Sequence, residues 1–276
     1  MRGTFTYSNP RVIHWGRGSV GELRTELERV NAHRVALIST RSVLSTDPLV
    51  GMVRRAMGGA SVGMTAAIGQ HAPFAQVHAA VEKADADLDG VVSFGGGSAV
   101  DAAKIFALKV AERRGEKGRP LPHIAIPTTL SVAELASGAG FTNEAGDKAG
   151  MRDPGLMAAA VIYDGDLTLT TPLGLWLSTG IRAVDHAVEA FLADGEHPYS
   201  DVMSLEGLRR LFDSLPRAKV SPADPDVRTE NQLAAWFSFT MPGESAGGLS
   251  HVMGKQIGAR HGIAHGVTSC LLLPHV

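Results

Sequence analysis

Four histidines lie close together near the end of the chain, and their chemistry could serve a reaction. The stretch RHGIAHGVTSC (260–270) carries His261 and His265, with His251 upstream and His275 beyond, all within 25 residues. Imidazole is a common metal ligand, and it also binds anions and transfers protons near neutral pH. This density favours a functional site, built around either a metal ion or an anionic substrate, over unrelated surface positions.

The segment GIRAVDHAVEAF (180–191) has the spacing of a helix with one polar face. Its polar residues recur at i, i+3, i+4 and i+7, namely Arg182, Asp185, His186 and Glu189. Its apolar face would consist of Ile181, Val184, Val188 and Phe191. The polar stripe is either a charged face in solvent or one wall of the site that the later histidines complete.

A second helix is predicted directly before the histidine pair, over GGLSHVMGKQIGAR (247–260). Its apolar residues are expected to face inward, namely Leu249, Val252, Met253 and Ile257. His251 and Lys255 share another side of this helix. The turn RHGIAHG then carries His261 and His265.

A glycine-rich turn in the first half of the chain has the features of a phosphate site. The stretch FGGGSAVDAAK (94–104) follows an apolar run and opens a helical pattern. Gly95, Gly96 and Gly97 let the backbone approach a phosphate, and the N–H groups at a helix start attract an anion. Ser98 caps the helix or donates its hydroxyl, and we include Asp101 among the cofactor-binding residues. The alternative is a turn that caps a helix and binds nothing.

The ends of neighbouring strands support a dinucleotide. In an open parallel sheet, ligands bind beyond the carboxyl ends of the strands. Besides the glycine turn, those ends carry hydroxyl side chains, namely Ser39, Thr40, Thr128, Thr129 and Ser131. Arg41 stands where an acidic residue would favour NAD, so NAD and NADP both remain open.

The elements that must position these residues fall into two parts. Strands are predicted at 34–40, 89–98, 123–129 and 159–164, with helices at 20–30 and 74–86. Strand–helix alternation predicts a parallel sheet with helices on both faces. From 173 onward the periodicity is helical, with a Pro-rich connector at 215–227. We therefore predict an α/β cofactor-binding domain at 1–168 and an all-helical domain at 169–276.

Composition limits the function classes. The formal net charge of −2 gives no electrostatic case for nucleic-acid binding. No apolar run approaches a membrane span, and the start MRGTFTYSNP lacks the apolar core of a signal peptide. The single cysteine, Cys270, cannot form an intrachain disulfide, so we expect a cytoplasmic protein. The apolar ending SCLLLPHV suggests that the helical domain is incomplete at Val276.

Several of these segments together resemble the iron-containing alcohol dehydrogenases, and within them the maleylacetate reductases. The resemblance rests on FGGGSAVDAAK, IPTTLSVAELA, KAGMRDPGLMAAAVIYDGDLT, GIRAVDHAVEAF and HVMGKQIGARHGIAHGVTSCLLLPHV. It implies a dinucleotide-binding α/β domain followed by a helical domain, the architecture shared with dehydroquinate synthase. It also implies NAD or NADP as cofactor, an active site between the domains, a homodimer, and chains that continue past the PHV motif.

The resemblance also bears on a metal. Metal-dependent members hold a divalent ion with an aspartate and three histidines, of which the aspartate and first histidine form D-x-x-x-H. The matching positions here are Arg182 for the aspartate, and His186, His251 and His265 for the histidines. A guanidinium at about 5 Å from a dication, with an effective dielectric near 20, would cost roughly 6–7 kcal/mol in repulsion. We therefore expect the metal to be absent, and name these three histidines as its ligands if it is bound.

Maleylacetate reductases share the four-histidine pattern, lack the metal aspartate and are regarded as working without a metal. The resemblance implies hydride transfer from NADH or NADPH to a small carboxylated substrate. Arg182 would pair with a carboxylate, and His186, His251 and His265 would orient the substrate. His251, His261 or His265 would supply the proton. Arg182, and the segment SVAE (131–134) in place of the more usual SGSE, depart from the family pattern and put the substrate in doubt.

Three other functions stay open from the sequence. The first is a metal-dependent alcohol dehydrogenase with iron or zinc on the three histidines, where the metal polarises the alcohol oxygen. The second is a sugar-phosphate cyclase, a lyase that retains NAD through its cycle. The third is a binding protein without turnover.

Overall fold

The protein is described by a computed structural model over residues 9–116, 118–240, 248–263 and 265–276. Within these, the side chains of Asp47, Ala259 and His265 lie outside the described part. The chain divides into two compact units. An α/β unit comprises residues 9–128 and 133–167, and a helical unit comprises residues 129–132 together with the chain from 168.

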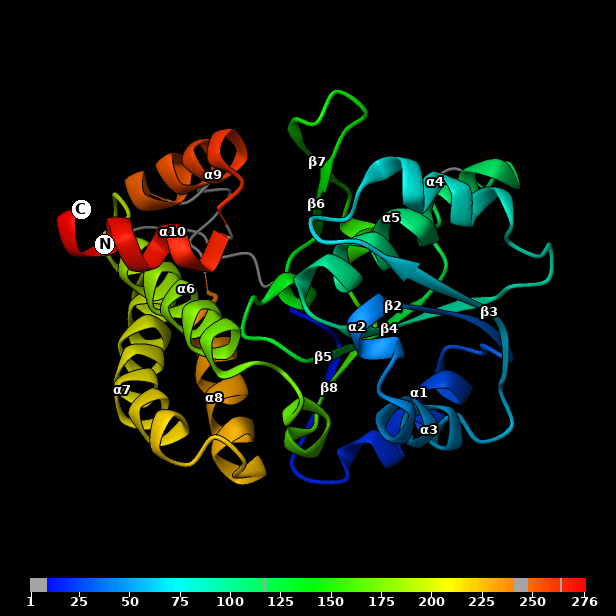
Figure 1. The fold of residues 1–276 in the computed structure, drawn as a ribbon, viewed down its shortest axis with the longest axis horizontal. Coiled ribbons are helices and arrows are strands. Elements are labelled where there is room, and N and C mark those ends of the chain that lie inside the picture. Colours follow the sequence, from blue (N-terminus) through cyan, green and yellow to red (C-terminus); the bar gives the residue numbers. More distant parts are fainter. Residues whose placement is uncertain (1–8, 117, 241–247, 264) are drawn as a thin grey trace. The chain divides into compact units, whose positions relative to one another are not determined.

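The α/β unit is built on a six-stranded, fully parallel sheet (Figure 1). Its strand order is β1–β8–β5–β4–β2–β3. The strands are β1 (Val12–Trp15), β2 (Arg34–Thr40), β3 (Ser61–Ile68), β4 (Gly90–Gly95), β5 (His123–Pro127) and β8 (Ala160–Tyr163). The four strands predicted from buried apolar runs are the four central ones. The two that the sequence did not indicate, β1 and β3, are the edges, where partial exposure removes the continuous apolar run.

Helices cover both faces of this sheet, as the predicted strand–helix alternation requires. One face carries α4 (Phe74–Glu82) and α5 (Gly97–Arg113), and the other carries α1 (Leu23–Arg29) and α3 (Asp47–Ala56) (Figure 1). Each face has its own core, one around Phe106 and the other around Phe94 and Leu37. The short helix α2 (Arg41–Leu44) follows β2, and an antiparallel hairpin of β6 (Gly138–Thr142) and β7 (Lys148–Arg152) packs near α5.

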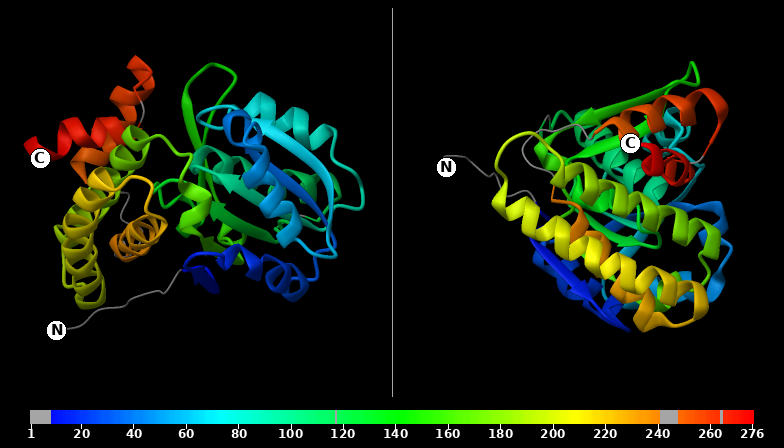
Figure 2. Two further views of the ribbon diagram at one scale, coloured as in Figure 1. Left: turned by 60° about the horizontal axis from the view of Figure 1, so that its bottom comes forward. Right: turned by 90° about the vertical axis from the view of Figure 1, so that its left-hand side faces the viewer.

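The helical unit contains α6 (Leu173–Phe191), α7 (Pro198–Val220), α8 (Pro225–Ser238), α9 (Leu249–His261) and α10 (His265–Leu272) (Figure 2). No strand occurs among its described residues. Gly207 allows α7 to pack closely on α8, because a Cβ there would lie 2.8 Å from the backbone nitrogen of Ser238. The buried Trp176 joins α6 to α8, with its indole N–H donating to Asn231 at 2.8 Å.

Two expectations for this unit are wrong. The predicted connector at 215–227 is mostly helix, because α7 runs through Pro216 to Val220 and α8 begins at Pro225. Pro216 has no N–H to donate to the carbonyl of Phe212, one helical turn earlier. Phe212 is 69% exposed, so water can hydrate its carbonyl on that side of the helix and the proline is tolerated.

The predicted inward face of α9 is the second. Leu249, Val252 and Met253 are exposed. Instead, α9 packs with its glycines: a Cβ at Gly254 would lie 2.8 Å from Thr268 Oγ1, and one at Gly258 would lie 2.9 Å from the Ile263 carbonyl. Close backbone approach through glycine therefore decides which side of α9 is buried.

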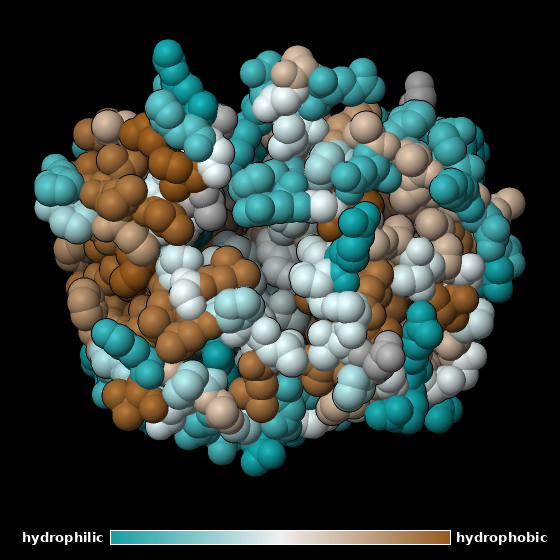
Figure 3. Space-filling view, in the orientation of Figure 1, coloured by the Kyte–Doolittle hydropathy of each residue, from teal (hydrophilic) through white to brown (hydrophobic). Residues whose placement is uncertain are grey.

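Apolar side chains gather on the surface of the helical unit (Figure 3). Among the described residues, Trp15 is the one large exposed hydrophobic residue outside this unit. None of the described helices combines the length and the apolar character needed to cross a membrane.

Candidate active site

The glycine turn joins the carboxyl end of β4 to the start of α5. Gly95 ends the strand with a φ of +149°, a conformation that L side chains rarely adopt, and a Cβ there would lie 3.0 Å from the Cβ of Ala99. Gly96 is extended and precedes the first helical residue, Gly97. The backbone can therefore turn sharply, and the three glycines add no side chain of their own at the helix N-terminus, which suits the approach of a phosphate.

The hydroxyls near this turn serve the fold as well. Ser98 Oγ accepts a hydrogen bond from the His71 backbone N–H at 2.9 Å, and the fully buried Ser39 donates to the Phe94 carbonyl. Thr40, by contrast, is only partly buried, with its hydroxyl 3.2 Å from that of Ser42. Thr128 donates its backbone N–H to the Gly95 carbonyl at 2.9 Å, which links the ends of β5 and β4.

Asp101 and Lys104 of α5 and Glu134 form a buried charged cluster. The sequence analysis did not identify Lys104 as part of it. Lys104, in the third turn of α5, donates to the carbonyls of Ala133, Ala136 and Gly138, at 2.6 Å and 3.0 Å for the first and last. Asp101 accepts from the Gly140 N–H. Burial lowers the pKa of Lys104 to about 8 and raises that of Asp101 to about 6. Lys104 holds the segment before β6 and the first residue of β6 to α5, and Asp101 holds β6 to α5. Asp101, which we predicted to bind the cofactor, therefore has a structural partner as well.

Glu134, in the unusual segment SVAE, belongs to the same cluster. Its carboxyl accepts from the Tyr163 hydroxyl at 2.9 Å, and burial raises its pKa to about 7. The signal for Lys104 and Glu134 was present in the sequence, since both are charged residues inside otherwise apolar or small-residue motifs.

The chain at 129–132 packs with the helical unit. Thr129 donates to Ser131 Oγ at 3.3 Å, and the Leu130 N–H donates to Thr179 at 3.1 Å. Val132 is buried with a φ of +53°, a conformation usual for glycine and rare for a β-branched residue. The SGSE pattern that the resemblance implies has glycine at this position, and glycine adopts a positive φ without strain.

The polar stripe of α6 is buried. Arg182 is 3% exposed, Asp185 is fully buried, and His186 and Glu189 are 5% and 8% exposed. Phe191, from the predicted apolar face, is 43% exposed. Of the two readings that the sequence left open, the structure excludes a charged face in solvent and places the stripe against α9 and α10.

Arg182 lies at the centre of this buried cluster. Its Nη1 donates to Asp185 Oδ2 at 2.7 Å and to Ser269 Oγ at 3.0 Å, and its Nη2 is 3.3 Å from His251 Nε2. Asp185 Oδ2 also accepts from the hydroxyls of Ser250 at 3.1 Å and Ser269 at 2.7 Å. Burial lowers the pKa of Arg182, and Asp185 opposes this shift. Sequence reasoning missed Ser250 and Ser269, because nothing in their local pattern ties them to a helix so far away in the chain.

The structure brings His186 and His251 together. Their ring centroids are 5.9 Å apart, and the His186 ring meets Phe239 edge-on at 5.1 Å. The His251 backbone N–H donates to Glu189 at 2.9 Å. Burial, followed by the nearby charge of Asp185, raises the pKa of Glu189.

The remaining histidines are placed less closely. His261 ends α9 and is exposed, and His275 is exposed in the last turn. His265 begins α10, but its side chain lies outside the described residues. The roles predicted for these three side chains therefore stay predictions.

The described side chains do not by themselves complete a site for a divalent metal. Among them, no group of three His, Cys, Asp or Glu residues is arranged to hold an ion. The side chain of His265, the third histidine that the resemblance implies as a ligand, lies outside the described part. At the position where the family resemblance implies an aspartate ligand, the chain has a buried guanidinium. Nη2 of this guanidinium lies 3.3 Å from His251 Nε2. A positive charge is therefore next to one of the two ring nitrogens with which a histidine binds a metal.

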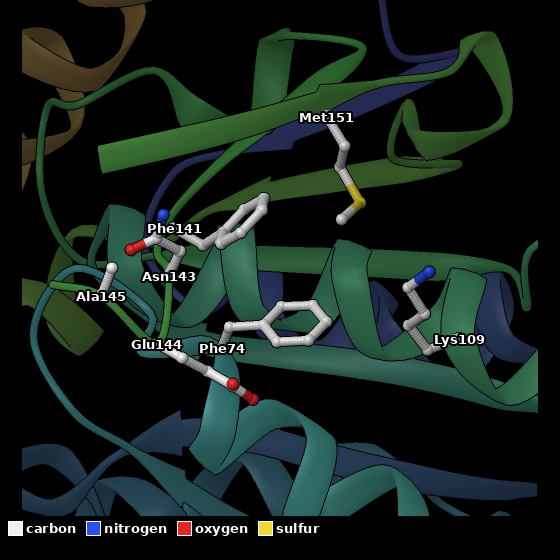
Figure 4. A pocket seen from close by; sticks show the side chains of 7 residues that line it. All are labelled: Phe74, Lys109, Phe141, Asn143, Glu144, Ala145 and Met151. Carbon is white, nitrogen blue, oxygen red and sulfur yellow. The ribbon is translucent and has the colours of Figure 1, made fainter. Parts of the chain in front are cut away.

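A separate cavity of about 480 Å³ lies in the α/β unit, between α4, α5 and the β6–β7 hairpin (Figure 4). Phe74, Phe141 and Met151 point into it, with Lys109 at one side. No residue predicted to bind cofactor or substrate lines it, so we do not place the reaction there.

Comparison with known proteins agrees with this architecture. The family model for iron-containing alcohol dehydrogenases matches residues 10–165, and the model for the C-terminal part of the Fe-containing alcohol dehydrogenase family matches 176–276. The chain therefore belongs to the iron-containing alcohol dehydrogenase family of oxidoreductases.

Within that family, the chain is similar to maleylacetate reductases. Maleylacetate reductase 1 of Cupriavidus pinatubonensis is 30% identical over 276 residues, which cover 99% of this chain and 73% of that protein. The crystal structure of maleylacetate reductase from Agrobacterium tumefaciens superimposes with a TM-score of 0.84 at 28% identity, covering 100% of this chain and 75% of the other.

A sulfoacetaldehyde reductase from Bifidobacterium kashiwanohense, solved in complex with NAD+, superimposes with a TM-score of 0.87 at 26% identity. The match covers 99% of this chain and 76% of that one.

Proposed function

We propose that this chain is a metal-independent, NAD(P)H-dependent reductase of a small carboxylated enoate or carbonyl compound, with maleylacetate as the first candidate. Family membership and the maleylacetate reductase relatives support the reaction class. We favour a reductase without a metal because the buried Arg182 guanidinium lies beside His251 Nε2.

The glycine turn and the start of α5 suit the pyrophosphate of a dinucleotide. Gly95, Gly96 and Gly97 add no side chain of their own at the helix N-terminus, and Ser98 is held there by its bond to His71. Thr128, Thr129 and Ser131 would line the nicotinamide end. When bound, the reduced nicotinamide supplies a hydride. The NAD+ complex of the sulfoacetaldehyde reductase supports this class of cofactor.

In the helical unit, His186 and His251 would orient the substrate and stabilise the negative charge that develops on it. We assign the proton to His261 or His265, because His251 already directs Nε2 at a guanidinium. Arg182 forms an ion pair with Asp185, so we do not assign it the contact with a substrate carboxylate that we expected from the sequence. We also propose a homodimer.

The proposal is tested by oxidation of NADH and of NADPH with maleylacetate, compared with a panel of short aldehydes. We expect maleylacetate to be the better substrate with at least one cofactor. His251→Ala should lower kcat about a hundredfold or more while cofactor affinity changes little. Turnover of aldehydes alone, dependent on added iron or zinc, would favour the metal-dependent alcohol dehydrogenase, and cofactor binding without any turnover would favour a binding protein.

A further inference from the structure

The buried ion pair on α6 has no counterpart in the hydride-transfer scheme above, and Asp185 and Arg182 are almost completely removed from solvent. Asp185 Oδ2 receives three donors, from Arg182, Ser250 and Ser269. These donors come from α6, α9 and α10, so three helices meet at one carboxylate oxygen. A guanidinium held in this way has little freedom to move toward a ligand.

We propose that Arg182 is a positioning residue, a fixed internal cation that holds the His251 imidazole with Nε2 as hydrogen-bond acceptor. This inference rests on the proposed function, since it assigns how that site orients His251. Arginine has donors and no acceptor, so a hydrogen bond between Nη2 and Nε2 requires the lone pair of Nε2. His251 is then neutral, with its ring proton on Nδ1.

The backbone of His251 is fixed by the same helix. Its N–H donates to Glu189, one helical turn beyond Asp185 on the buried stripe of α6. A Cβ at Gly248 would lie 3.0 Å from Glu189 Cγ and Oε1, so the start of α9 lies directly against this carboxyl. Arg182 therefore holds the ring and Glu189 holds the main chain, and both come from α6.

This arrangement gives His251 a restricted chemical role. While the bond to Arg182 persists, Nε2 carries no proton and cannot donate one to a substrate. Arg182 also places a positive charge where a metal-binding residue would have been negative. The site is thus polarised by a cation built into the chain, and His251 orients the reacting groups without acting as the general acid.

The first experiment reads the tautomer directly, by NMR of the protein labelled at the histidine ring nitrogens, with the His251 signals assigned from their loss in His251→Gln. In the wild type we expect neutral His251 protonated on Nδ1. A His251 signal protonated on Nε2 overturns the proposal without any variant of Arg182.

Variants then test the cause. Removing Arg182 alone would leave Asp185 buried without its cation, so the informative protein is the double variant Arg182→Met/Asp185→Asn, in which both charges are removed. It should lose the preference for Nδ1. Arg182→Lys, which keeps a cationic donor, should retain part of it. The matched control Ser250→Ala removes a donor to Asp185 but leaves Arg182 in place, and should keep the wild-type tautomer. An unchanged tautomer in the double variant contradicts the proposal.

Kinetics separate positioning from proton donation. The amide oxygen of His251→Gln can accept from Arg182, so this variant should keep at least about tenfold more kcat than His251→Ala, with the pH dependence of the wild type. A general acid at His251 would instead make Gln and Ala equally inactive, which contradicts the inference. The tautomer is measured without substrate, so it tests the role of Arg182 independently of the reaction. If His251 shows the predicted tautomer but the protein reduces no enoate, the proposed function is contradicted and the role of Arg182 is not.

Discussion

At the scale of single residues, Gly95 and Val132 show two outcomes of the same backbone requirement. Both have positive φ, at +149° and +53°. At position 95 the residue is glycine, which adopts a positive φ without strain, and a Cβ there would also crowd Ala99. Val132 meets it with a β-branched side chain that is buried, so packing of the surrounding segment must offset the strain.

Gly95→Ala should weaken NADH binding by about tenfold or more, because the strained turn would shift the start of α5 and its N–H groups. Fluorescence titration with NADH measures this. The matched control is Gly146→Ala in the β6–β7 hairpin, where φ is +86° but no atom lies within 4 Å of the added Cβ. The control should lose about 1 kcal/mol of stability and no cofactor affinity. Equal NADH affinity in Gly95→Ala and wild type would remove the glycine turn from the cofactor site.

At the scale of elements, periodicity predicted α6 correctly but did not show that its polar face is buried as well as part of its apolar face, where Val184 is 5% exposed. Hydrophobicity favoured the face that includes Phe191, yet Arg182 and Asp185 are inside because Ser250 and Ser269 satisfy them from helices more than sixty residues later. The error on α9 also arises from contacts between distant parts of the chain, because the close approach of Gly254 and Gly258 to Thr268 of α10 determines which side of α9 is buried. The central strands were predictable because burial on both faces requires an apolar run, and the edge strands lack that requirement.

The sequence also limits what could be said of the candidate site. The glycine turn has a local signature, and its position between β4 and α5 follows from that signature. The pairing of Arg182 with Asp185 and His251 depends on tertiary packing, so spacing alone allowed either a substrate contact or an internal ion pair.

The start of β5 carries a pH dependence that can be measured. His123 is buried, its Nε2 is 2.7 Å from the Ser93 hydroxyl, and burial lowers its pKa from 6.5 to about 3. Between these values the unfolded chain binds a proton that the folded chain does not. The His123 contribution to stability is therefore complete above pH 6.5 and is lost as the pH falls toward 3, by up to about 1.4 kcal/mol per pH unit.

Denaturant unfolding at a series of pH values tests this prediction. His123→Gln should show a shallower loss of unfolding free energy below pH 6.5 than the wild type. The control His78→Gln, at an exposed position on α4, should follow the wild type. If the His123→Gln and wild-type slopes coincide, the histidine is not buried neutral in the folded protein.

At the scale of the whole molecule, every large exposed hydrophobic residue in the described part of the chain except Trp15 belongs to the helical unit. On α7, Val202, Leu205 and Phe212 lie on one face and are 65%, 51% and 69% exposed. Exposed apolar patches of this kind mark contact sites with other polypeptides. A second copy of the chain is the occupant that our proposed homodimer supplies.

Phe212→Glu should therefore shift the protein from dimer to monomer, because it places a charge in that face. Sedimentation equilibrium measures the change, with circular dichroism to confirm that the helices persist. Trp15→Glu is the control, since Trp15 is 56% exposed on the α/β unit and should leave the dimer intact. A wild-type monomer, or a Phe212→Glu dimer of unchanged affinity, would place the apolar face outside any dimer contact.

In our proposal, the Arg182 guanidinium replaces the metal in an oxidoreductase of the iron-containing alcohol dehydrogenase family. The most direct measurement is NAD(P)H oxidation with maleylacetate before and after treatment with EDTA, with elemental analysis of the same samples. We predict turnover that EDTA does not change in protein without stoichiometric metal. About one iron or zinc ion per chain, with activity lost to EDTA and restored by that metal, would contradict the claim and show that Arg182 moves aside for the ion.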